Sequence, residues 1–476
     1  MTKPASSSTP NSGMNSGERT AALSLSSIYA LRMMGLFMIL PVFSLYAHDH
    51  LTGATPLLIG LAIGIYGLAN AVFQIPFGML SDRFGRKPII AFGLLLFAIG
   101  SVVAALSDTI TGVIIGRAIQ GSGAIAAAVM ALAADLTREE HRLKIMAMIG
   151  MTIGLSFSSA LVLGPLLNDW IGVSGIFWLT AVLALAGIGV LHLWVPQPIA
   201  STFHRDAEAV PSQFMDILKD VELLRLNFSI FALHLILTAS FVVVPVALRD
   251  HAGLIGSQHW MVYLGVQLIS MAVMIPFIIY AEKYRHMKQV FFGCVVAIAL
   301  AQAGLGFAHT STIAISLSLL LFFIAFNVLE ATLPSLIAKT APSEKKGTAM
   351  GIYSTTQFLG AFTGGIMGGW LYGAVGITAV FALCAGVATV WAVTAASMRE
   401  PRYLSNHLLK VGHAEVQLSP QQAQVLAQRL RQIRGVAEAT VIAEDGIAYL
   451  KVDTQTLDND ALSEFSTASE FSATKA

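Results

Sequence analysis

Apolar residues occupy most of this chain in long blocks, and short polar stretches separate the blocks at fairly regular intervals. A block of about 20 apolar residues is long enough to cross the hydrocarbon core of a bilayer as an α-helix. Twelve blocks of this length are present, so twelve membrane-spanning helices are expected. The predicted spans are 24–47, 56–81, 89–107, 110–135, 144–168, 174–195, 222–248, 260–281, 289–308, 312–338, 347–371 and 376–397.

The composition agrees with this pattern, because the polar residues are too few to cover a water-soluble protein of this size. Of the 476 residues, 55% are hydrophobic and 12% are charged, whereas soluble domains carry about 25% charged residues. The net charge of +1 provides no basic face for nucleic acid. Cys294 and Cys384 both lie inside apolar blocks, so neither a disulfide framework nor a metal site is expected.

Basic residues are distributed unevenly among the short segments between the spans. Alternate segments carry fifteen Lys or Arg, whereas the other six carry Arg249 alone. Basic residues are enriched in cytoplasmic loops, so both termini are expected in the cytoplasm. The fifteen are Arg83, Arg86, Lys87, Arg138, Arg142, Lys144, Arg205, Lys219, Arg225, Lys283, Arg285, Lys288, Lys339, Lys345 and Lys346.

The chain also repeats itself. Residues 76–84 (PFGMLSDRF) match residues 276–284 (PFIIYAEKY) at an offset of 200, with acid, base and aromatic residues in register. A second match, at an offset of 202, relates 147–164 to 349–366. Two parallel six-helix halves, 21–197 and 222–398, are therefore predicted, with a substrate site at their interface.

The segments outside the two halves are polar or mixed. Residues 1–20 predict a disordered tail, and the first apolar block is interpreted as a retained helix rather than a removed signal peptide. The linker 198–221 contains apolar residues at helical spacing, which indicate either an interfacial amphipathic helix or an early start of the seventh span. These residues are Phe214, Ile217, Leu218, Val221 and Leu224.

Residues 399–466 predict a small soluble domain, followed by a tail over 467–476. Its predicted elements are a strand at 414–418, a helix at 420–433, strands at 437–443 and 447–452 joined at Asp445-Gly446, and a helix at 457–465. This order suggests a ferredoxin-like fold and resembles heavy-metal-associated domains. However, residues 419–422 (SPQQ) lack the paired cysteines of those domains. A regulatory, docking or self-associating role is expected instead of metal transfer.

Residues 78–88 read GMLSDRFGRKP and fit, without a break, a loop signature of the major facilitator superfamily. The chain is similar to this family, which implies an all-α bundle of twelve helices that works by alternating access. The resemblance also implies a conformational latch in which Asp82 faces the start of the eleventh span and Arg86 pairs with Asp135. The alternative is that these charges only orient the protein. The latch residues are Gly78, Asp82, Arg83, Gly85, Arg86, Lys87 and Asp135.

Two further patterns resemble motifs of the same family. Arg117 and Gln120 lie in an R-x-x-Q-G-x-G-A pattern that is typical of proton-coupled members. The fifth span carries glycines that resemble the antiporter motif, although Asn168 stands where another glycine is expected. Close packing between helices is the alternative reason for these small residues. The motif positions are Gly150, Gly154, Gly164 and Pro165.

Four ionisable residues lie away from span ends: Arg32, Arg117, His234 and Glu330, in spans 1, 4, 7 and 10. In the family these four helices line the central cavity, and an ionisable group at membrane depth is costly enough to indicate function. We therefore predict a polar cavity for a small-molecule substrate. Its predicted lining comprises these residues with Gln120, Asn327 and Gln357.

Glu330 is the one carboxylate deep within an apolar span, about eight residues, or roughly 12 Å, from the cytoplasmic end. Arg32 lies at a similar depth in the first span. Glu330 is therefore either a proton carrier or the partner of Arg32 in a permanent ion pair. His234 is a second candidate for proton coupling, with a simple hydrogen bond to a neighbouring helix as its alternative.

These features together resemble the YajR-type branch of proton-driven drug antiporters in bacterial inner membranes. The resemblance implies export of small, often hydrophobic compounds in exchange for protons, with no cofactor. No GxxxxGK[ST] phosphate loop is present, so ATP is not the expected energy source. The alternatives are a metabolite importer or facilitator and a ligand sensor that signals through residues 399–476. No catalytic constellation indicates an enzyme.

Overall fold

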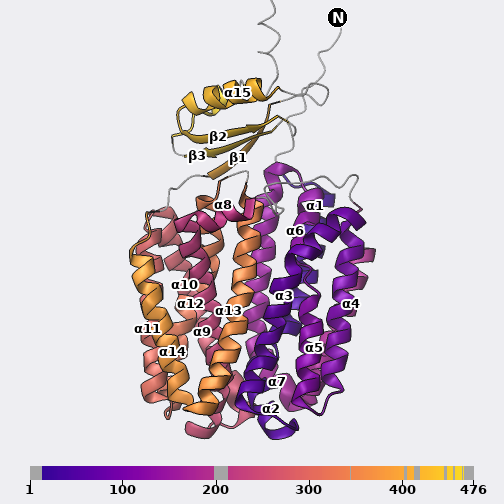
Figure 1. Ribbon diagram of the computed structural model, residues 1–476, viewed down its shortest axis with the longest axis vertical. Helices are drawn as coiled ribbons and strands as arrows, with labels where there is room; N and C mark the ends of the chain where they lie inside the picture. The colour runs from indigo at the N-terminus through magenta and orange to yellow at the C-terminus, as the bar shows by residue number, and fades with distance from the viewer. Residues whose placement is uncertain are drawn as a thin grey trace, which may run out of the picture.

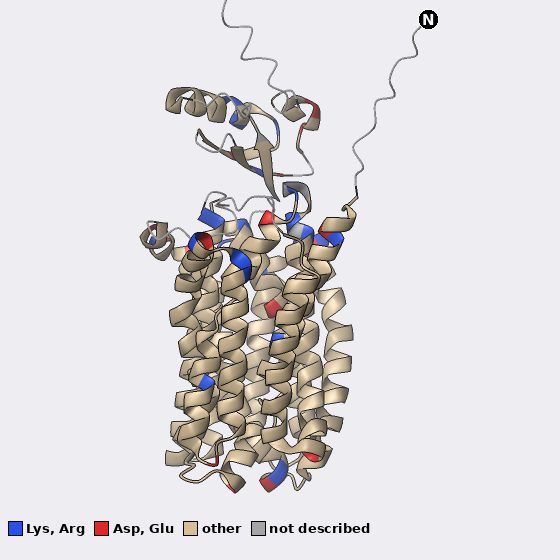
Figure 2. Ribbon diagram, turned by 90° about the vertical axis from the view of Figure 1, so that its right-hand side faces the viewer, with Lys and Arg blue, Asp and Glu red and all other residues tan. Residues whose placement is uncertain are grey.

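The computed structural model describes residues 13–197, 213–342, 345–400, 405–411, 419–443, 447–453, 456–463 and 465. A bundle of long helices carries a small α/β domain at one end (Figure 1). We call this end of the bundle the domain end, and the opposite end the far end. Charged residues gather at the two ends, whereas the middle of the bundle is almost entirely uncharged (Figure 2).

The N-terminal half of the bundle contains one helix that crosses the membrane twice. Its elements are α1 (Ser16–Phe37), α2 (Phe43–His50), α3 (Pro56–Phe84), α4 (Arg86–Ala105), α5 (Ile110–Ser122), α6 (Ala126–Asp135) and α7 (Glu139–Leu193). The 55 residues of α7 greatly exceed the roughly 20 that span a bilayer. Gly172, with φ of 69°, breaks the helix, because left-handed backbone suits glycine.

The C-terminal half follows the same plan. Its elements are α8 (Phe214–Lys219), α9 (Val221–Val246), the π-helical η2 (Ala247–His251), the 3-10 turn η3 (Gly256–Gln258), α10 (His259–Lys283), α11 (Met287–Ala308), α12 (Thr312–Thr340), α13 (Lys346–Ala374) and α14 (Ile377–Ala396). Within the described residues, ten helical segments are long and apolar enough to cross a membrane, with α5 and α6 as one segment. The second pass of α7 and the glycine-rich α13 complete the twelve predicted spans.

The linker helix α8 is separate from the seventh span. The carboxylate of Asp220 accepts hydrogen bonds from the backbone N–H groups of Glu222 and Leu223 at the start of α9. Such an N-cap marks the beginning of a new helix. The alternative of an early start of the seventh span is therefore wrong, and residues 198–212 of the predicted linker lie outside the described residues.

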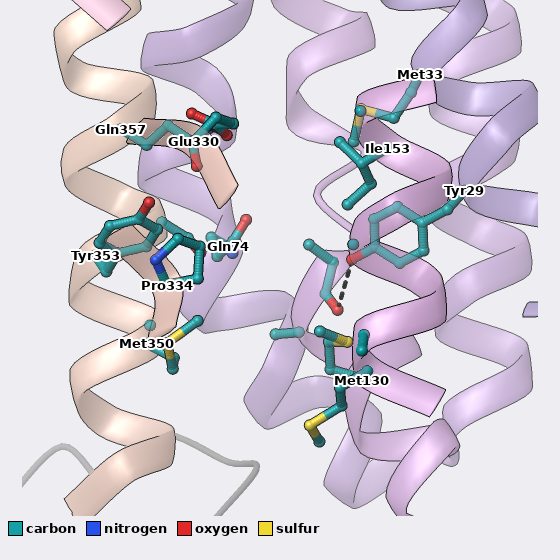
Figure 3. Close-up of a pocket in the computed structure, with 18 of the residues that line it drawn as sticks. Tyr29, Met33, Gln74, Met130, Ile153, Glu330, Pro334, Met350, Tyr353 and Gln357 are labelled. Carbon is teal, nitrogen blue, oxygen red and sulfur yellow. Dashed lines mark hydrogen bonds between the residues drawn. The ribbon is translucent and has the colours of Figure 1, made fainter. Parts of the chain in front are cut away.

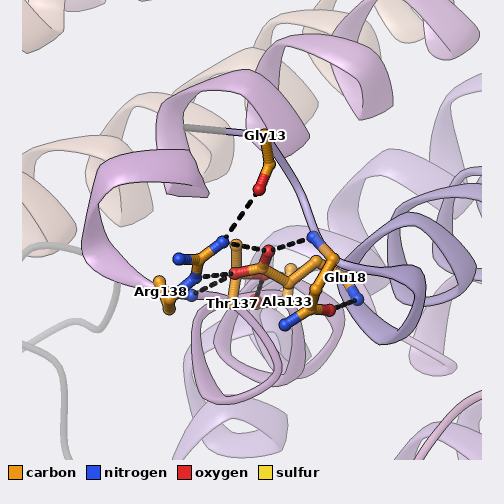
Figure 4. Close-up of polar contacts among 6 residues, drawn as sticks. Gly13, Glu18, Ala133, Thr137 and Arg138 are labelled. Carbon is orange, nitrogen blue, oxygen red and sulfur yellow. Dashed lines mark hydrogen bonds and ion pairs between the residues drawn. The ribbon is translucent and has the colours of Figure 1, made fainter. Parts of the chain in front are cut away.

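The first helix begins earlier than the sequence pattern indicated. Asn15 and Glu18 form a reciprocal capping box at the start of α1, which satisfies N–H groups that a helix end leaves free. Glu18 is buried and accepts hydrogen bonds of 3.0 Å from both the backbone N–H and Nε of Arg138 (Figure 4). The predicted disordered tail over residues 1–20 is thus too long, since helical structure begins at Ser16.

The C-terminal domain is a three-stranded antiparallel sheet with one covered face. Its elements are β1 (Ser405–Lys410), α15 (Pro420–Gln432), β2 (Val436–Ile442), β3 (Ile447–Val452) and α16 (Asn459–Ser463), and the strand order is β1-β3-β2. Leu426 and Leu430 of α15 pack in one hydrophobic cluster with Leu450 and Val452. The other face of the sheet is turned toward the helix bundle (Figure 1).

The described elements follow the predicted β-α-β-β-α order, with the first strand of the sheet earlier in the chain than the predicted one. The structure forms it at 405–410, ahead of the predicted 414–418, a segment that lies outside the described residues together with Asp445-Gly446. An isolated alternation of a few apolar residues is a weak strand signal, because pairing with β3 decides which segment joins the sheet. α15, β2 and β3 lie within one or two residues of their predicted positions.

Candidate functional site

A cavity of about 2170 Å³ lies between the two halves and reaches the domain end of the bundle. Its walls are mostly apolar and are unusually rich in methionine, whose flexible thioether side chain adapts to ligands of different shape. Eight methionines line it: Met33, Met79, Met130, Met146, Met151, Met271, Met274 and Met350. The cavity is large enough for a drug-sized molecule.

A polar cluster on the C-terminal wall centres on Glu330 of α12. Its Oε1 accepts a hydrogen bond of 3.3 Å from Nε2 of Gln357, and its Oε2 lies 3.9 Å from Nε2 of His234. The same Gln357 nitrogen lies 2.8 Å from Nε2 of His234. Across the cavity, Tyr29, Met33 and Ile153 face this cluster (Figure 3). Three helices, α9, α12 and α13, therefore meet at one titratable site.

Two neighbouring polar residues, Asn327 and Tyr353, lie close to this site. Asn327, one turn before Glu330, donates to Oγ of Ser270 over 3.1 Å and so ties α12 to α10. The hydroxyl of Tyr353 lines the cavity and, among the described residues, has no hydrogen-bond partner. Oε2 of Glu330 likewise accepts no hydrogen bond from the described residues. Both atoms are buried and, among the described residues, leave a hydrogen-bonding capacity unused beside the cavity.

Two of the buried arginines, Arg32 and Arg117, lie at or behind the N-terminal wall. Arg117 lines the cavity, and its guanidinium lies 5.0 Å from the ring centre of Tyr66. Arg32 lies behind the wall, where its Nη2 donates to the hydroxyl of Tyr66 over 2.7 Å. Gln120 is also behind the wall, since it accepts from Arg117 and donates to Ser101. Arg32 and Gln120 were predicted to line the cavity, but both instead support the residues that line it.

The alternative ion pair between Arg32 and Glu330 is absent from the described contacts. Arg32 is 1% exposed and bonds only to the hydroxyl of Tyr66 and the carbonyl oxygen of Gly123. Equal depth did not bring the two side chains together, because Arg32 turns toward α3 within its own half. Glu330 is therefore not held by a permanent cation in this conformation.

The predicted latch residues lie at the domain end, beside the cavity. Arg86 pairs with Asp82 and, over 3.2 Å, with Asp135, so the predicted pairing of Arg86 with Asp135 is present. Lys87 donates to the carbonyl oxygen of Val195 over 2.6 Å. Arg83 is exposed and lies over the ring of Phe84. Among the described residues, Asp82 forms its hydrogen bond and ion pair with Arg86 and not with α13.

The remaining motif glycines have two different environments. A Cβ added to Gly150 or Gly154 would meet nothing within 4 Å, and both residues line the cavity. A Cβ on Gly164, one residue before Pro165, would lie 2.2 Å from the carbonyl oxygen of Met38. Close helix packing therefore accounts for Gly164 but not for Gly150 and Gly154. Of the two latch glycines, Gly78 lies within α3, and Gly85 lies between α3 and α4 with φ of 93°.

Most of the chain matches the profile of one protein family. The profile of the Major Facilitator Superfamily matches residues 25–365 and 328–441. The chain belongs to the major facilitator superfamily. The profile covers both halves of the bundle, including the latch loop and the Glu330 cluster.

Two similar proteins carry the names of a transport protein and a multidrug resistance protein. The inner membrane transport protein YajR of Escherichia coli (strain K12) is 48% identical over 442 residues, which are 93% of this chain and 96% of that protein. The multidrug resistance protein MdtH of Yersinia enterocolitica is 25% identical over 349 residues, or 72% of this chain and 84% of that protein. This superfamily member is therefore a multi-pass membrane transporter and not an enzyme.

Solved structures share the fold. A bacterial homologue of the human lysosomal transporter Spinster, in an inward-facing and occupied conformation, superposes with a TM-score of 0.68 at 12% identity, covering 80% of this chain and 97% of that chain. The human organic anion transporter MFSD10 gives a TM-score of 0.60 at 18% identity, covering 80% of this chain and 100% of that chain. The chain thus has the superfamily fold, with its cavity reaching one end.

The C-terminal domain of this superfamily member closes over part of the cavity mouth, which the sequence did not indicate. Leu408 of β1 and Tyr449 of β3 line the cavity. Nζ of Lys451 donates to the carbonyl oxygens of Lys339 and Thr340, at 3.0 and 3.3 Å, at the end of α12. A cation at a helix C-terminus is favourable, because the last carbonyls there lack intrahelical partners.

Proposed function

We propose that this protein is a proton-coupled antiporter that exports small, mostly hydrophobic compounds by alternating access. The observation that carries the proposal is the position of Glu330. Of the described acidic residues that line the cavity, Asp82 and Asp135 lie at the domain end, and Glu330 alone lies at mid-depth. A carboxylate there meets both the solute space and a neutral hydrogen-bonding cluster.

The contacts of Glu330 support proton exchange at this residue. Closing an apolar cavity over an uncompensated charge is strongly unfavourable. The protein can therefore pass through a closed intermediate when Glu330 carries a proton or when a bound solute compensates the charge of Glu330. Both conditions use the same oxygen atoms, so the proton and the solute compete. Such competition is the physical requirement for antiport, since each ligand must leave before the other is carried.

Gln357 and His234 complete this proton site. One Gln357 nitrogen contacts both Glu330 and His234, so the amide N–H groups face two acceptors. Nδ1 of His234 lies 3.3 Å from the carbonyl oxygen of Ile230, which fits a neutral imidazole with its proton on Nδ1. His234 then accepts at Nε2, and a proton arriving there would displace Gln357. The cluster thus links proton binding to the position of α13.

The cavity lining supports hydrophobic substrates of varied shape. Eight methionines and several aromatic residues provide adaptable apolar contacts, and flexible methionine-rich surfaces suit ligands of differing shape. One relative carries the name multidrug resistance protein, which is consistent with this substrate class. We propose lipophilic cations as the first compounds to test, because their charge would replace the proton on Glu330.

The orientation follows from the positive charges. The segments that join spans at the domain end contain the clustered Lys and Arg residues, so the positive-inside rule places this end in the cytoplasm. Both termini and the C-terminal domain are then cytoplasmic. The cavity reaches the same end, and the conformation is accordingly inward-facing. No cofactor enters the proposal, because the proton gradient supplies the energy.

The proposal is tested by proton release when substrate binds. Purified protein in weakly buffered detergent solution is titrated with a panel of lipophilic cations, such as tetraphenylphosphonium and ethidium, beside a pH indicator. Wild type is expected to release protons as it binds, whereas Glu330→Gln binds without release. Asp169→Asn, which removes an exposed carboxylate, is the matched control and should release protons like wild type. Equal release from Glu330→Gln would overturn the assignment.

A further inference from the structure

The two halves of the bundle meet at the far end through an ion pair. Nη1 of Arg249, in η2, lies 2.5 Å from Oδ2 of Asp49, in α2. Nε of Arg249 also lies 2.7 Å from Oδ1 of Asp250. On the other side, Nδ1 of His48 lies 2.9 Å from Oδ1 of Asp49. Four charged or titratable side chains from both halves therefore form one cluster.

The internal repeat explains why these two positions meet. Asp49 and Arg249 are separated by 200 residues, the same offset that relates residues 76–84 to 276–284. They occupy equivalent places at the ends of the first and seventh spans, and the symmetry of the repeats brings these ends together. Arg249 is also the single basic residue in the sequence segments predicted on this side.

The backbone beneath the ion pair is closely packed across the same boundary. A Cβ added to Gly60 of α3 would lie 2.0 Å from the carbonyl oxygen of Gly365 in α13. A Cβ on Gly369 would lie 2.3 Å from the carbonyl oxygen of Pro56. No side chain fits between these backbones, so α3 and α13 touch directly. The far end is therefore closed in the conformation whose cavity reaches the domain end.

We propose that Asp49 and Arg249 form a latch that holds the far end closed and that must break before the cavity opens there. The proposal rests on the alternating access of the proposed function. Opening the far end moves α3 away from α13, and this separates α2 from η2, since α2 precedes α3 and contacts α9. The ion pair then exists only in the conformation that is closed at the far end.

The charges around Arg249 predict how strongly each substitution favours opening of the far end. The Arg249 and Asp49 side chains are 29% and 39% exposed, and partly exposed ion pairs shift an equilibrium by about two- to fivefold. Removing Asp49 leaves Arg249 paired with Asp250. Removing Arg249 instead leaves two carboxylates without their shared cation. Arg249→Gln is therefore expected to favour opening more than Asp49→Asn does.

The latch is tested by the accessibility of the cavity floor from the far end. Leu40, which is 8% exposed and lines the cavity, is replaced by cysteine in a full-length chain with Cys294 and Cys384 changed to alanine. A membrane-impermeant maleimide is added outside right-side-out vesicles, and the labelling rate is measured. Asp49→Asn should raise the rate about two- to fivefold, and Arg249→Gln should raise it further.

Two further variants complete the test. The exchange of both charges, Asp49→Arg with Arg249→Asp, should return labelling to within about twofold of wild type, because the pair is rebuilt with opposite polarity. Arg285→Gln, which removes an ion pair with Asp453 at the domain end, should leave labelling unchanged. Wild-type labelling in Arg249→Gln, or failure of the exchanged pair to restore it, would overturn the latch. Labelling does not depend on protons, so this outcome is distinct from a failure of proton coupling in Glu330→Gln.

Discussion

Nε2 of Gln357 lies 2.8 Å from Nε2 of His234, and this contact joins α13 to α9 beside the acidic site. α13 also forms the closest contacts with α3 of the other half. A change in protonation that breaks the contact would therefore act on the helix that connects the two halves. Gln357 is in this view a positioning residue between the proton site and the moving interface.

Gln357→Met should reduce proton-driven transport by at least fivefold while leaving substrate binding within about threefold of wild type. Methionine has a similar size but donates no hydrogen bond, so Glu330 and His234 lose their shared donor. Uptake in proteoliposomes and equilibrium binding measure the two effects separately. Thr363→Val is the matched control on the same helix, because within the described part of the chain the Thr363 hydroxyl donates to a backbone carbonyl of its own helix. Unchanged transport in Gln357→Met would contradict this role.

Tyr66→Phe should destabilise the protein by about 1–3 kcal/mol, because it leaves a buried donor of Arg32 unsatisfied. Nη2 of Arg32 donates to the Tyr66 hydroxyl over 2.7 Å, and Nε and Nη1 already have no partner among the described residues. Thermal unfolding in detergent measures the effect as a lower Tm. Tyr46→Phe, which removes a half-buried hydroxyl contact to Ser174, is the control and should lower the Tm less.

Lys451→Met should loosen the C-terminal domain from the bundle without abolishing transport. Lys451 is 3% exposed, and its ammonium group is held by two carbonyl oxygens at the end of α12. Hydrogen exchange should rise several-fold in β3 and over residues 336–340. Arg429→Met on the exposed side of α15 is the control. Loss of transport in Lys451→Met would contradict this expectation. After deletion of residues 401–476 a transporter should still move substrate, whereas a sensor should lose its output.

Asp49→Asn should change the transport rate by the same factor at every pH between about 5 and 8. Burial alone would raise the pKa of Asp49, but hydrogen bonds from His48 and Arg249 outweigh it and hold the pKa below its ordinary value. A carboxylate whose pKa is depressed in the folded protein contributes its full stabilising free energy at pH values above its unfolded-state pKa, which is about 3.9 for aspartate. It loses this contribution only as the pH falls through the folded-state pKa. The ionised latch therefore persists across this range.

Transport rates of Asp49→Asn and wild type at pH 5, 6, 7 and 8 test this expectation. His48→Gln serves as the control for the neighbouring titratable group, which contacts Asp49 directly. A variant-to-wild-type ratio that changes more than about threefold across the series would show that the latch itself titrates. A constant ratio leaves the pH dependence of transport to the cavity site.

Local patterns were sufficient to predict most of the bundle. The apolar blocks predict the spans because a bilayer requires about 20 apolar residues for each crossing. The contact of Arg86 with Asp135 was predictable from a resemblance carried by eleven consecutive residues. The cavity position of Glu330 was predictable because a carboxylate at membrane depth needs a solvated or polar surrounding.

Features that depend on packing were not predictable in this way. The depth of Arg32 and Glu330 could be counted along each helix, but the direction of each side chain depends on how the helices rotate against their neighbours. Arg32 turns toward Tyr66 for this reason. The pairing of Asp49 with Arg249 was missed, although the 200-residue offset and the isolated arginine together pointed to it.

The central claim is that Glu330 couples substrate movement to protons, and one comparison in proteoliposomes tests it directly. Substrate-loaded vesicles are given either an opposing proton gradient or only external substrate, and uptake is measured for wild type and Glu330→Gln. Wild type should accumulate substrate against its gradient in the first condition and exchange it in the second. Glu330→Gln should lose proton-driven accumulation and keep exchange, because the neutral amide takes up no proton and leaves no charge to be compensated when the cavity closes over the substrate. Proton-driven accumulation at the wild-type rate in Glu330→Gln would contradict the account.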